Sequence, residues 1–167
     1  MATLHVICGK AGAGKTTLAR SLAQSLPAVM FGEDEWIDTL GLGADSPAEF
    51  SMARFGQAIA KCRAVIGPLA GQILRLGVSV VFDFAGNTVK SRQWARDVAE
   101  TAGADLLLHV IAATDAECLA AIHRRNAEKP PGLYWGDVSD EIFHAVTAYF
   151  VPPRPEEGFR IRLHNRA

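Results

Sequence analysis

The sequence has 167 residues, of which 49% are hydrophobic, and a formal net charge of -1. A chain of this length typically forms one domain with a substantial core. The near-neutral charge, with no run of lysine or arginine longer than two, excludes a protein that grips nucleic acid or anionic lipid through bulk charge. No apolar stretch approaches the roughly 20 residues of a membrane span.

The three cysteines, Cys8, Cys62 and Cys118, lie far apart and form no C-x-x-C pair. This spacing predicts free, buried thiols in a reducing compartment rather than disulfides or a zinc site. The first residues show no basic segment followed by a long apolar run, so we expect no signal peptide. We therefore expect a cytoplasmic protein with no nucleic-acid or membrane partner, and the sequence leaves monomer and homodimer both open.

Apolar segments alternate with amphipathic ones along the chain. The first half predicts a strand over 3–8, a helix over 15–26, a strand over 28–31, a short helix after Asp34, and a long helical pattern over 47–76 broken near Gly67-Pro68. The second half predicts strands over 78–84, 105–112 and 159–163, helices over 89–102, from Thr114 or Asp115 to about 127, and over 139–150, and irregular loops over 128–137 and 151–158.

This alternation of strands and helices predicts the fold class. The strands are almost continuously apolar, as in a parallel sheet that is buried on both faces. We therefore expect an α/β fold in which a five-stranded parallel sheet is covered by helices on both sides. No repeat or charged linker divides the chain, so residues 1–167 are expected to form a single domain.

Residues 9–17 read GKAGAGKTT and fit the phosphate-binding pattern G-x-x-x-x-G-K-[ST] between a predicted strand and a predicted helix. Glycines allow positive φ, so that backbone N–H groups converge on phosphate oxygens. Lys15 is expected to reach the β- and γ-phosphates, and the Thr16 hydroxyl to bind Mg²⁺. The predicted ligands are ATP and Mg²⁺, and the predicted nucleotide-binding residues of this loop are Gly9, Ala11, Gly12, Ala13, Gly14, Lys15, Thr16 and Thr17.

Acidic side chains follow two strands that are predicted to end at the same edge of the sheet. Asp83 closes the strand over 78–84, where it is expected to hold Mg²⁺ directly or through water, or else to cap the next turn. In the run Glu33-Asp34-Glu35, we select Asp34 as the base that takes a proton from an acceptor hydroxyl, or as a magnesium ligand. The alternative is a solvated acidic helix start that suits the helix dipole, which we favour for Glu33 and Glu35.

Cationic candidates for stabilising a transferred phosphate lie later in the chain. Arg124 and Arg125 end a predicted helix before a Pro-rich loop, and we expect them to close over the phosphates, although a helix C-terminus attracts arginine in any case. Arg92 is a further candidate for an anion contact or a structural role. For the segment Leu133-Tyr134-Trp135 three interpretations remain: part of a lid, a wall of the acceptor site, or ordinary packing. The five histidines show no ligand spacing and are interpreted as structural or surface residues.

The order of these blocks resembles a known family. The segments CGKAGAGKTTLARSLA, FGEDEWIDTL, VVFDFAGNTVKSR, CLAAIHRRNA and AYFVPPRPEEGF follow one another as in small ATP-dependent kinases of the P-loop superfamily. Within that superfamily the chain is similar to the predicted AAA-type kinase family, relatives of zeta-toxin sugar-nucleotide kinases and chloramphenicol phosphotransferase. The resemblance covers nearly the whole chain, but only the phosphate loop is specific on its own.

The resemblance implies an adenylate-kinase-like, three-layer P-loop NTPase fold with strand order 2-3-1-4-5 and a small lid at about 126–138. It also implies roles for individual residues: Asp34 matches the catalytic base, Asp83 the acid that closes the third strand, Arg125-Asn126 a pair that enters the lid, and Pro152-Pro153 with Glu157 a loop near the adenine. Two positions depart from the family pattern. Gly86-Asn87 stands where many relatives carry an aromatic residue, and Ala121 stands where an arginine is frequent.

These features predict an ATP-dependent phosphotransferase that moves the γ-phosphate of MgATP to a hydroxyl of a small molecule, such as an antibiotic, a sugar or a nucleoside derivative. The alternative is a nucleotide-gated binding module with slow hydrolysis. A nucleoside monophosphate kinase is disfavoured, because the region between the second and third strands offers only Arg54, Arg63 and Arg75 for an acceptor phosphate. The missing N-K-x-D segment argues against a signalling GTPase but leaves the preference between ATP and GTP open.

Overall fold

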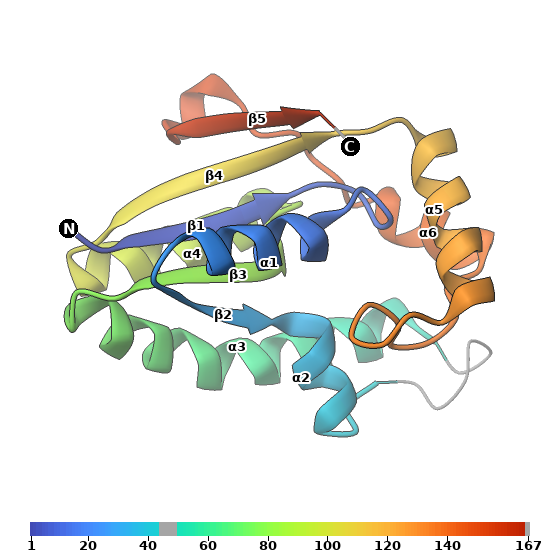
Figure 1. The fold of residues 1–167 in the computed structure, drawn as a ribbon, viewed down its shortest axis with the longest axis horizontal. Coiled ribbons are helices and arrows are strands. Elements are labelled where there is room, and N and C mark those ends of the chain that lie inside the picture. The colour runs from blue at the N-terminus through green and yellow to red at the C-terminus, as the bar shows by residue number, and fades with distance from the viewer. Residues whose placement is uncertain (44–49, 166–167) are drawn as a thin grey trace.

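The fold is built on one parallel sheet, whose strands run from β5 at the top of Figure 1 to β2 at the bottom. The structure is a computed structural model that describes residues 1–43 and 50–165. The sheet order is β2-β3-β1-β4-β5, and every neighbouring pair is parallel, as the resemblance implied. The strands are β1 (Thr3–Cys8), β2 (Ala28–Gly32), β3 (Ser79–Ala85), β4 (Asp105–Ala112) and β5 (Ile161–Asn165).

Helices cover both faces of the sheet, which confirms the three-layer prediction (Figure 1). They are α1 (Lys15–Ser25), α2 (Glu33–Thr39), α3 (Met52–Arg75), α4 (Val89–Ala102), α5 (Asp115–Glu128), α6 (Asp140–Thr147) and the 3-10 turn η2 (Pro155–Glu157). On β1, Val6 packs into the core shared with α3 and α4, whereas Ile7 packs into the core shared with α1, α5 and α6. Successive side chains of a strand point to opposite faces, so one apolar run fills two cores. In the described part of the chain, none of the helices combines the length and apolarity that crossing a bilayer requires.

The predicted break in the long helix near Gly67-Pro68 is wrong, because α3 runs through both residues. Proline removes one helical hydrogen bond, but Pro68 lies on the exposed side of α3, as does Ala64, whose carbonyl loses its partner. Gly67 is buried, and a Cβ there would lie 3.3 Å from Cζ2 of Trp94 in α4. Close packing of α3 on α4 therefore outweighs the helix-breaking tendency of the pair.

Several predicted boundaries also differ from the structure; the helix predicted over 139–150, for example, runs from Asp140 to Thr147. The long helix begins at Met52, with Ser51 as its N-cap, and the first residues of the predicted range lie partly outside the described residues. The last strand begins at Ile161 rather than at Phe159. The chain leaves η2 through Gly158 in the left-handed region, and Phe159 then packs under the guanidinium of Arg96 at 4.1 Å, so pairing starts only beyond it.

Three histidines form a hydrogen-bonded chain across β1, β4 and β5. His5 Nδ1 lies 3.0 Å from His109 Nε2, and His109 Nδ1 lies 2.9 Å from His164 Nε2. Burial lowers the pKa of all three groups, and that of His109 falls to about 4, helped by the nearby charge of Arg162. These residues are structural, as the sequence suggested, and they are neutral at neutral pH.

The three hydrogen-bonded histidines predict that the protein loses stability in mild acid. The unfolded state takes up protons below pH 6.5, whereas folded His109 resists protonation down to a pH of about 4, so stability falls as the pH drops through this window. His109 alone should lower the free energy of unfolding by about 2 kcal/mol between pH 7 and pH 5. Urea unfolding of His109→Gln should show a smaller decrease over that range than the wild type. His123→Gln, which changes an exposed histidine, is the control and should keep the wild-type slope; equal slopes in all three proteins would contradict this account.

Candidate phosphate-binding site

The loop between β1 and α1 has the backbone that its glycines predicted. Gly12 and Gly14 adopt φ values of 75° and 99°, and Gly14 is the N-cap of α1. Gly12 lies against α5 so closely that a Cβ would come within 2.4 Å of the carbonyl oxygen of Cys118. The loop therefore needs glycine at this position both for its backbone conformation and for its contact with α5.

The two lysines of the loop are both held in place. Lys15, the first residue of α1, donates from Nζ to the carbonyl of Lys10 at 3.0 Å, so its ammonium group folds back over the loop. Lys10 is held from the other direction, since its Nζ lies 2.5 Å from Oδ1 of Asp115 at the start of α5. The Lys15 side chain is thus positioned above the backbone amides that would receive a phosphate.

Asp83 lies beside the loop, as predicted. It pairs in register with Gly32 of β2, and its carboxylate accepts a hydrogen bond from the side chain of Thr16. Burial raises the pKa of Asp83, while the Thr16 hydrogen bond and the charge of Lys15 oppose that rise. A hydroxyl and a carboxylate are oxygen ligands of the kind that Mg²⁺ prefers.

The structure separates the three acids at the start of α2. Asp34 and Glu35 are exposed, but Glu33 is only 4% exposed, so its prediction as a solvated acid is wrong. Arg63 of α3 donates from Nε to Glu33 at 2.9 Å. Burial raises the pKa of Glu33, and the pair with Arg63 counteracts this. Thirty residues separate the partners, so no local pattern in the sequence indicates the pair.

Arg63 is further fixed by its surroundings. Its Nη1 donates to the hydroxyl of Ser91 at 3.0 Å, and its guanidinium lies 4.9 Å from the ring centroid of Trp94. The same side chain thus makes an ion pair, a hydrogen bond and a cation–π contact. The described residues contain no cluster of three or more His, Cys, Asp or Glu suited to a metal ion. Beside the loop, the structure brings the Thr16 hydroxyl to the Asp83 carboxylate, which lies within reach of the charge of Asp34.

The two ends of the Pro-rich loop after α5 are joined by hydrogen bonds between Asn126 and Val138. The side-chain amide of Asn126 donates to the backbone carbonyl of Val138 at 2.8 Å and accepts from the backbone N–H of Val138 at 3.3 Å. Arg20 of α1 donates to the carbonyl of Gly132 at 2.5 Å and so ties the loop to the phosphate side of the molecule. Arg124 is exposed, whereas Arg125 is half-buried and its Nε has no hydrogen-bond partner among residues 1–43 and 50–165.

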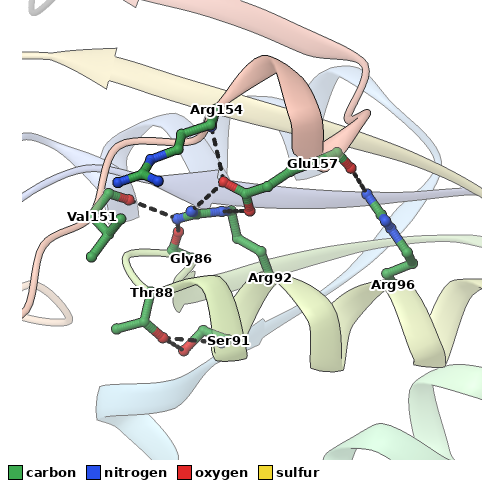
Figure 2. Close-up of polar contacts among 8 residues, drawn as sticks. All are labelled: Gly86, Thr88, Ser91, Arg92, Arg96, Val151, Arg154 and Glu157. Atoms are coloured by element: carbon green, nitrogen blue, oxygen red, sulfur yellow. Dashed lines mark hydrogen bonds and ion pairs between the residues drawn. The ribbon is translucent and has the colours of Figure 1, made fainter.

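Arg92 does not serve as an anion contact, because its donors are committed to the protein (Figure 2). It is completely buried and makes two hydrogen bonds of 2.7 Å to the carboxylate of Glu157. Its Nη1 also donates to the carbonyls of Gly86 and Val151, each at 2.9 Å. Glu157, which the resemblance placed near the adenine, is therefore the partner of Arg92, and hydrogen bonds from Arg92 lower the pKa of its carboxyl.

Asn87 is the residue whose contribution sequence reasoning missed. Its Oδ1 accepts from the N–H of Gly9 at 2.9 Å, and its Nδ2 donates to the carbonyl of Gly9 at 2.9 Å. The preceding Gly86 donates to the carbonyl of Ile7 at 2.9 Å. In the sequence, Asn87 stands out only as a departure from the family pattern. In the structure, its side chain contacts the first residue of the phosphate loop.

A hollow of about 460 Å³ lies beside the loop. Lys10 and Phe150 border it, together with the end of β4 and the start of α5, and Pro153 follows Phe150 by three residues. Its walls combine apolar side chains with a few polar groups, as is usual for small-molecule sites. Its residues are Lys10, Val110, Ile111, Ala112, Ala113, Thr114, Glu117 and Phe150.

Comparison with known proteins agrees with this geometry. A family model described as an AAA domain matches residues 4–153. The chain belongs to this family. The match includes the phosphate loop, Asp34, Asp83 and the Pro-rich loop after α5, and it ends just before η2. No curated protein matches the sequence.

Solved structures show the same fold at low sequence identity. A candidate kinase from Chloroflexus aurantiacus has a TM-score of 0.74 at 19% identity, over 98% of this chain and 85% of that one. Kti12 from Chaetomium thermophilum, in complex with ADP-AlF3, has a TM-score of 0.70 at 15% identity, over 97% and 88%. A gluconokinase from Sinorhizobium meliloti has a TM-score of 0.64 at 14% identity, over 99% and 83%. These structures show that the chain shares their fold.

The packing of the loop on α5 predicts that Gly12→Ala is strongly destabilising. The left-handed backbone alone costs an alanine about 1–2 kcal/mol, and the close contact with Cys118 adds an overpacking cost of about 1–3 kcal/mol. Gly77→Ala is a matched control, since Gly77 has φ 83° and no atom within 4 Å of the added Cβ. Chemical denaturation should show the larger loss of unfolding free energy for Gly12→Ala, and equal losses would show that α5 does not constrain the loop.

Proposed function

We propose that the protein is an ATP-dependent phosphotransferase that moves the γ-phosphate of MgATP to a hydroxyl of a small molecule. The observation that carries this proposal is the arrangement at the ends of β1, β2 and β3. There, Lys15 lies over a glycine-rich loop, the Thr16 hydroxyl is bonded to Asp83, and Asp34 stands exposed at the start of α2. A nucleotide cradle, a magnesium ligand set and a proton acceptor are the parts that phosphoryl transfer requires.

The loop supplies the nucleotide contacts in this proposal. The backbone amides of residues 11–17 and the ammonium of Lys15 bind the phosphates. The hollow bordered by Lys10 and Phe150, near Pro153, receives the adenine ring of the nucleotide. Thr16 and Asp83 would hold Mg²⁺, directly or through water, and Asp34 is left free to act as the base. When bound, the metal neutralises phosphate charge as the bond to the leaving ADP breaks.

Asp34 acts as the base. As the acceptor oxygen bonds to the γ-phosphorus, its hydroxyl proton passes to the Asp34 carboxylate, and the bond between the γ-phosphorus and the ADP oxygen breaks. Its neighbour Glu33 does not compete for this role, since Arg63 holds it in a buried pair at 2.9 Å. At the end of α5, Arg124 and Arg125 supply the positive charge for the transferred phosphate in this proposal.

Paired arginines support an uncharged acceptor. Between the second strand and the fourth, Arg63 is bound to Glu33 and Arg92 is bound to Glu157. Removing Arg63 from the buried Glu33 to bind an anionic substrate would leave a buried charge uncompensated, at a cost of several kcal/mol. Arg92 is itself completely buried against Glu157 and is not available to a substrate. A hydroxyl on a neutral molecule, such as a sugar, a nucleoside or an antibiotic, does not require this exchange.

A panel of hydroxyl-bearing metabolites and antibiotics, with their phosphorylated counterparts, tests the proposal through acceptor-stimulated release of ADP. We expect stimulation by an uncharged member of the panel and no stimulation by its phosphorylated counterpart. MgATP binding with slow hydrolysis and no response to any acceptor would favour a nucleotide-gated binding module instead.

Asp34→Asn should abolish turnover without preventing nucleotide binding. The amide keeps the shape of the carboxylate but takes no proton, so acceptor-dependent ADP release should fall by about 100-fold or more. The affinity for MgATP, measured by calorimetry, should change little. Glu35→Gln, at the exposed neighbouring acid, is the matched control and should retain turnover. Normal turnover in Asp34→Asn would remove this residue from the role of base.

A further inference from the structure

We propose that Asn87 is a positioning residue for the phosphate loop and thereby sets the affinity for the nucleotide. This inference rests on the proposed function, because it assumes that the loop binds the phosphates of ATP. Asn87 follows β3, and its side chain spans the gap to the end of β1. There it binds both polar groups of the Gly9 backbone, each at 2.9 Å.

The chemistry of this contact suits asparagine. Gly9 presents one N–H and one carbonyl to the side chain, and a carboxamide accepts from the first while it donates to the second. An aspartate of the same shape accepts from the N–H but has no donor for the carbonyl, and it adds a negative charge beside the phosphate loop. The N–H of Gly9 is committed to Asn87, so Gly9 contributes to the site through the conformation it fixes at the start of the loop.

A buried network fixes Asn87 in turn. Its own carbonyl accepts from the N–H of Val151 at 2.8 Å. Arg92 bonds to the carbonyls on either side of this contact, at Gly86 and at Val151, and its guanidinium is completely buried against Glu157 (Figure 2). The turn that carries Asn87 is thus bonded to β1, to α4 and to the loop after α6, and has little freedom to move.

The same network reaches the segment between α6 and β5. Glu157 also accepts from the backbone N–H of Arg154 at 2.9 Å, and its own backbone carbonyl accepts from Arg96 (Figure 2). The contacts therefore run without interruption from η2, through Arg92 and Asn87, to Gly9. The phosphate loop, near the start of the chain, is thus linked to residues near its end.

The other side of the loop is held against α5, by packing at Gly12 and by the ion pair of Lys10 with Asp115. Gly12 lies against the carbonyl of Cys118 in α5. Loss of the Asn87 side chain leaves this contact in place but frees the Gly9 peptide groups, so the loop amides lose part of their alignment before a nucleotide arrives. A cradle that is less preorganised binds its ligand more weakly.

Calorimetric titration with MgATP tests the inference on four proteins: the wild type, Asn87→Ala, Asn87→Asp and the control Thr88→Ala. Thr88 is the N-cap of α4; its hydroxyl accepts from the N–H of Ser91 at 3.0 Å and donates to the Ser91 hydroxyl at 2.9 Å (Figure 2). We expect Asn87→Ala to bind MgATP about tenfold more weakly and Asn87→Asp to bind it more weakly still. Thr88→Ala should keep the wild-type affinity while losing thermal stability, because a helix cap is removed.

A readout of turnover separates positioning from general damage. In Asn87→Ala the KM for ATP should rise about tenfold while the KM for the acceptor stays within about twofold of the wild-type value. Wild-type affinity in both Asn87 variants overturns the inference but leaves the proposed function intact, whereas a wild-type protein that does not bind MgATP overturns both. An equal loss of affinity in Thr88→Ala also overturns the inference, and if Asn87→Ala fails to fold, the isosteric Asn87→Asp decides the outcome.

Discussion

The site depends on one constraint, which is that the loop between β1 and α1 holds a left-handed backbone at Gly12 and Gly14 while it is fixed from two sides. Packing fixes one side, where Gly12 meets α5, and hydrogen bonds fix the other, where Asn87 binds Gly9. A flexible loop, not fixed by the rest of the protein, would lose conformational entropy each time it closed on a phosphate. Because the protein has already ordered the loop, that cost is met during folding and the loop presents aligned amides to the ligand.

The parallel sheet brings the remaining groups to the same edge. The order β2-β3-β1 places the ends of three strands side by side, so that Asp83 meets Thr16 and the α2 acids lie next to them. Several acids close together need different environments if they are to have different roles. Here Glu33 is buried and paired with Arg63, Asp83 is bonded to a hydroxyl, and Asp34 remains exposed. This division is what supports Asp34 as the proton acceptor.

Local patterns in the sequence predicted much of this structure. Continuous apolar runs identified the strands, and the glycines at 12 and 14 identified the loop, since both signals depend on neighbouring residues only. The tertiary contacts were not predictable in this way. The break expected at Pro68 failed because packing against Trp94 keeps the helix intact. The pairs Arg63–Glu33 and Arg92–Glu157 join residues 30 and 65 positions apart, and a single sequence carries no signal of their contact.

The central claim is that residues 9–16 bind the phosphates of a nucleotide, and a crystal structure with magnesium and a nonhydrolysable ATP analogue tests it most directly. The account predicts that Nζ of Lys15 leaves the carbonyl of Lys10 and binds phosphate oxygens at about 3 Å, while the Thr16 hydroxyl turns to the metal. Crystals in which the analogue binds elsewhere, or in which Lys15 keeps its contact with Lys10 at saturating analogue, would contradict the account.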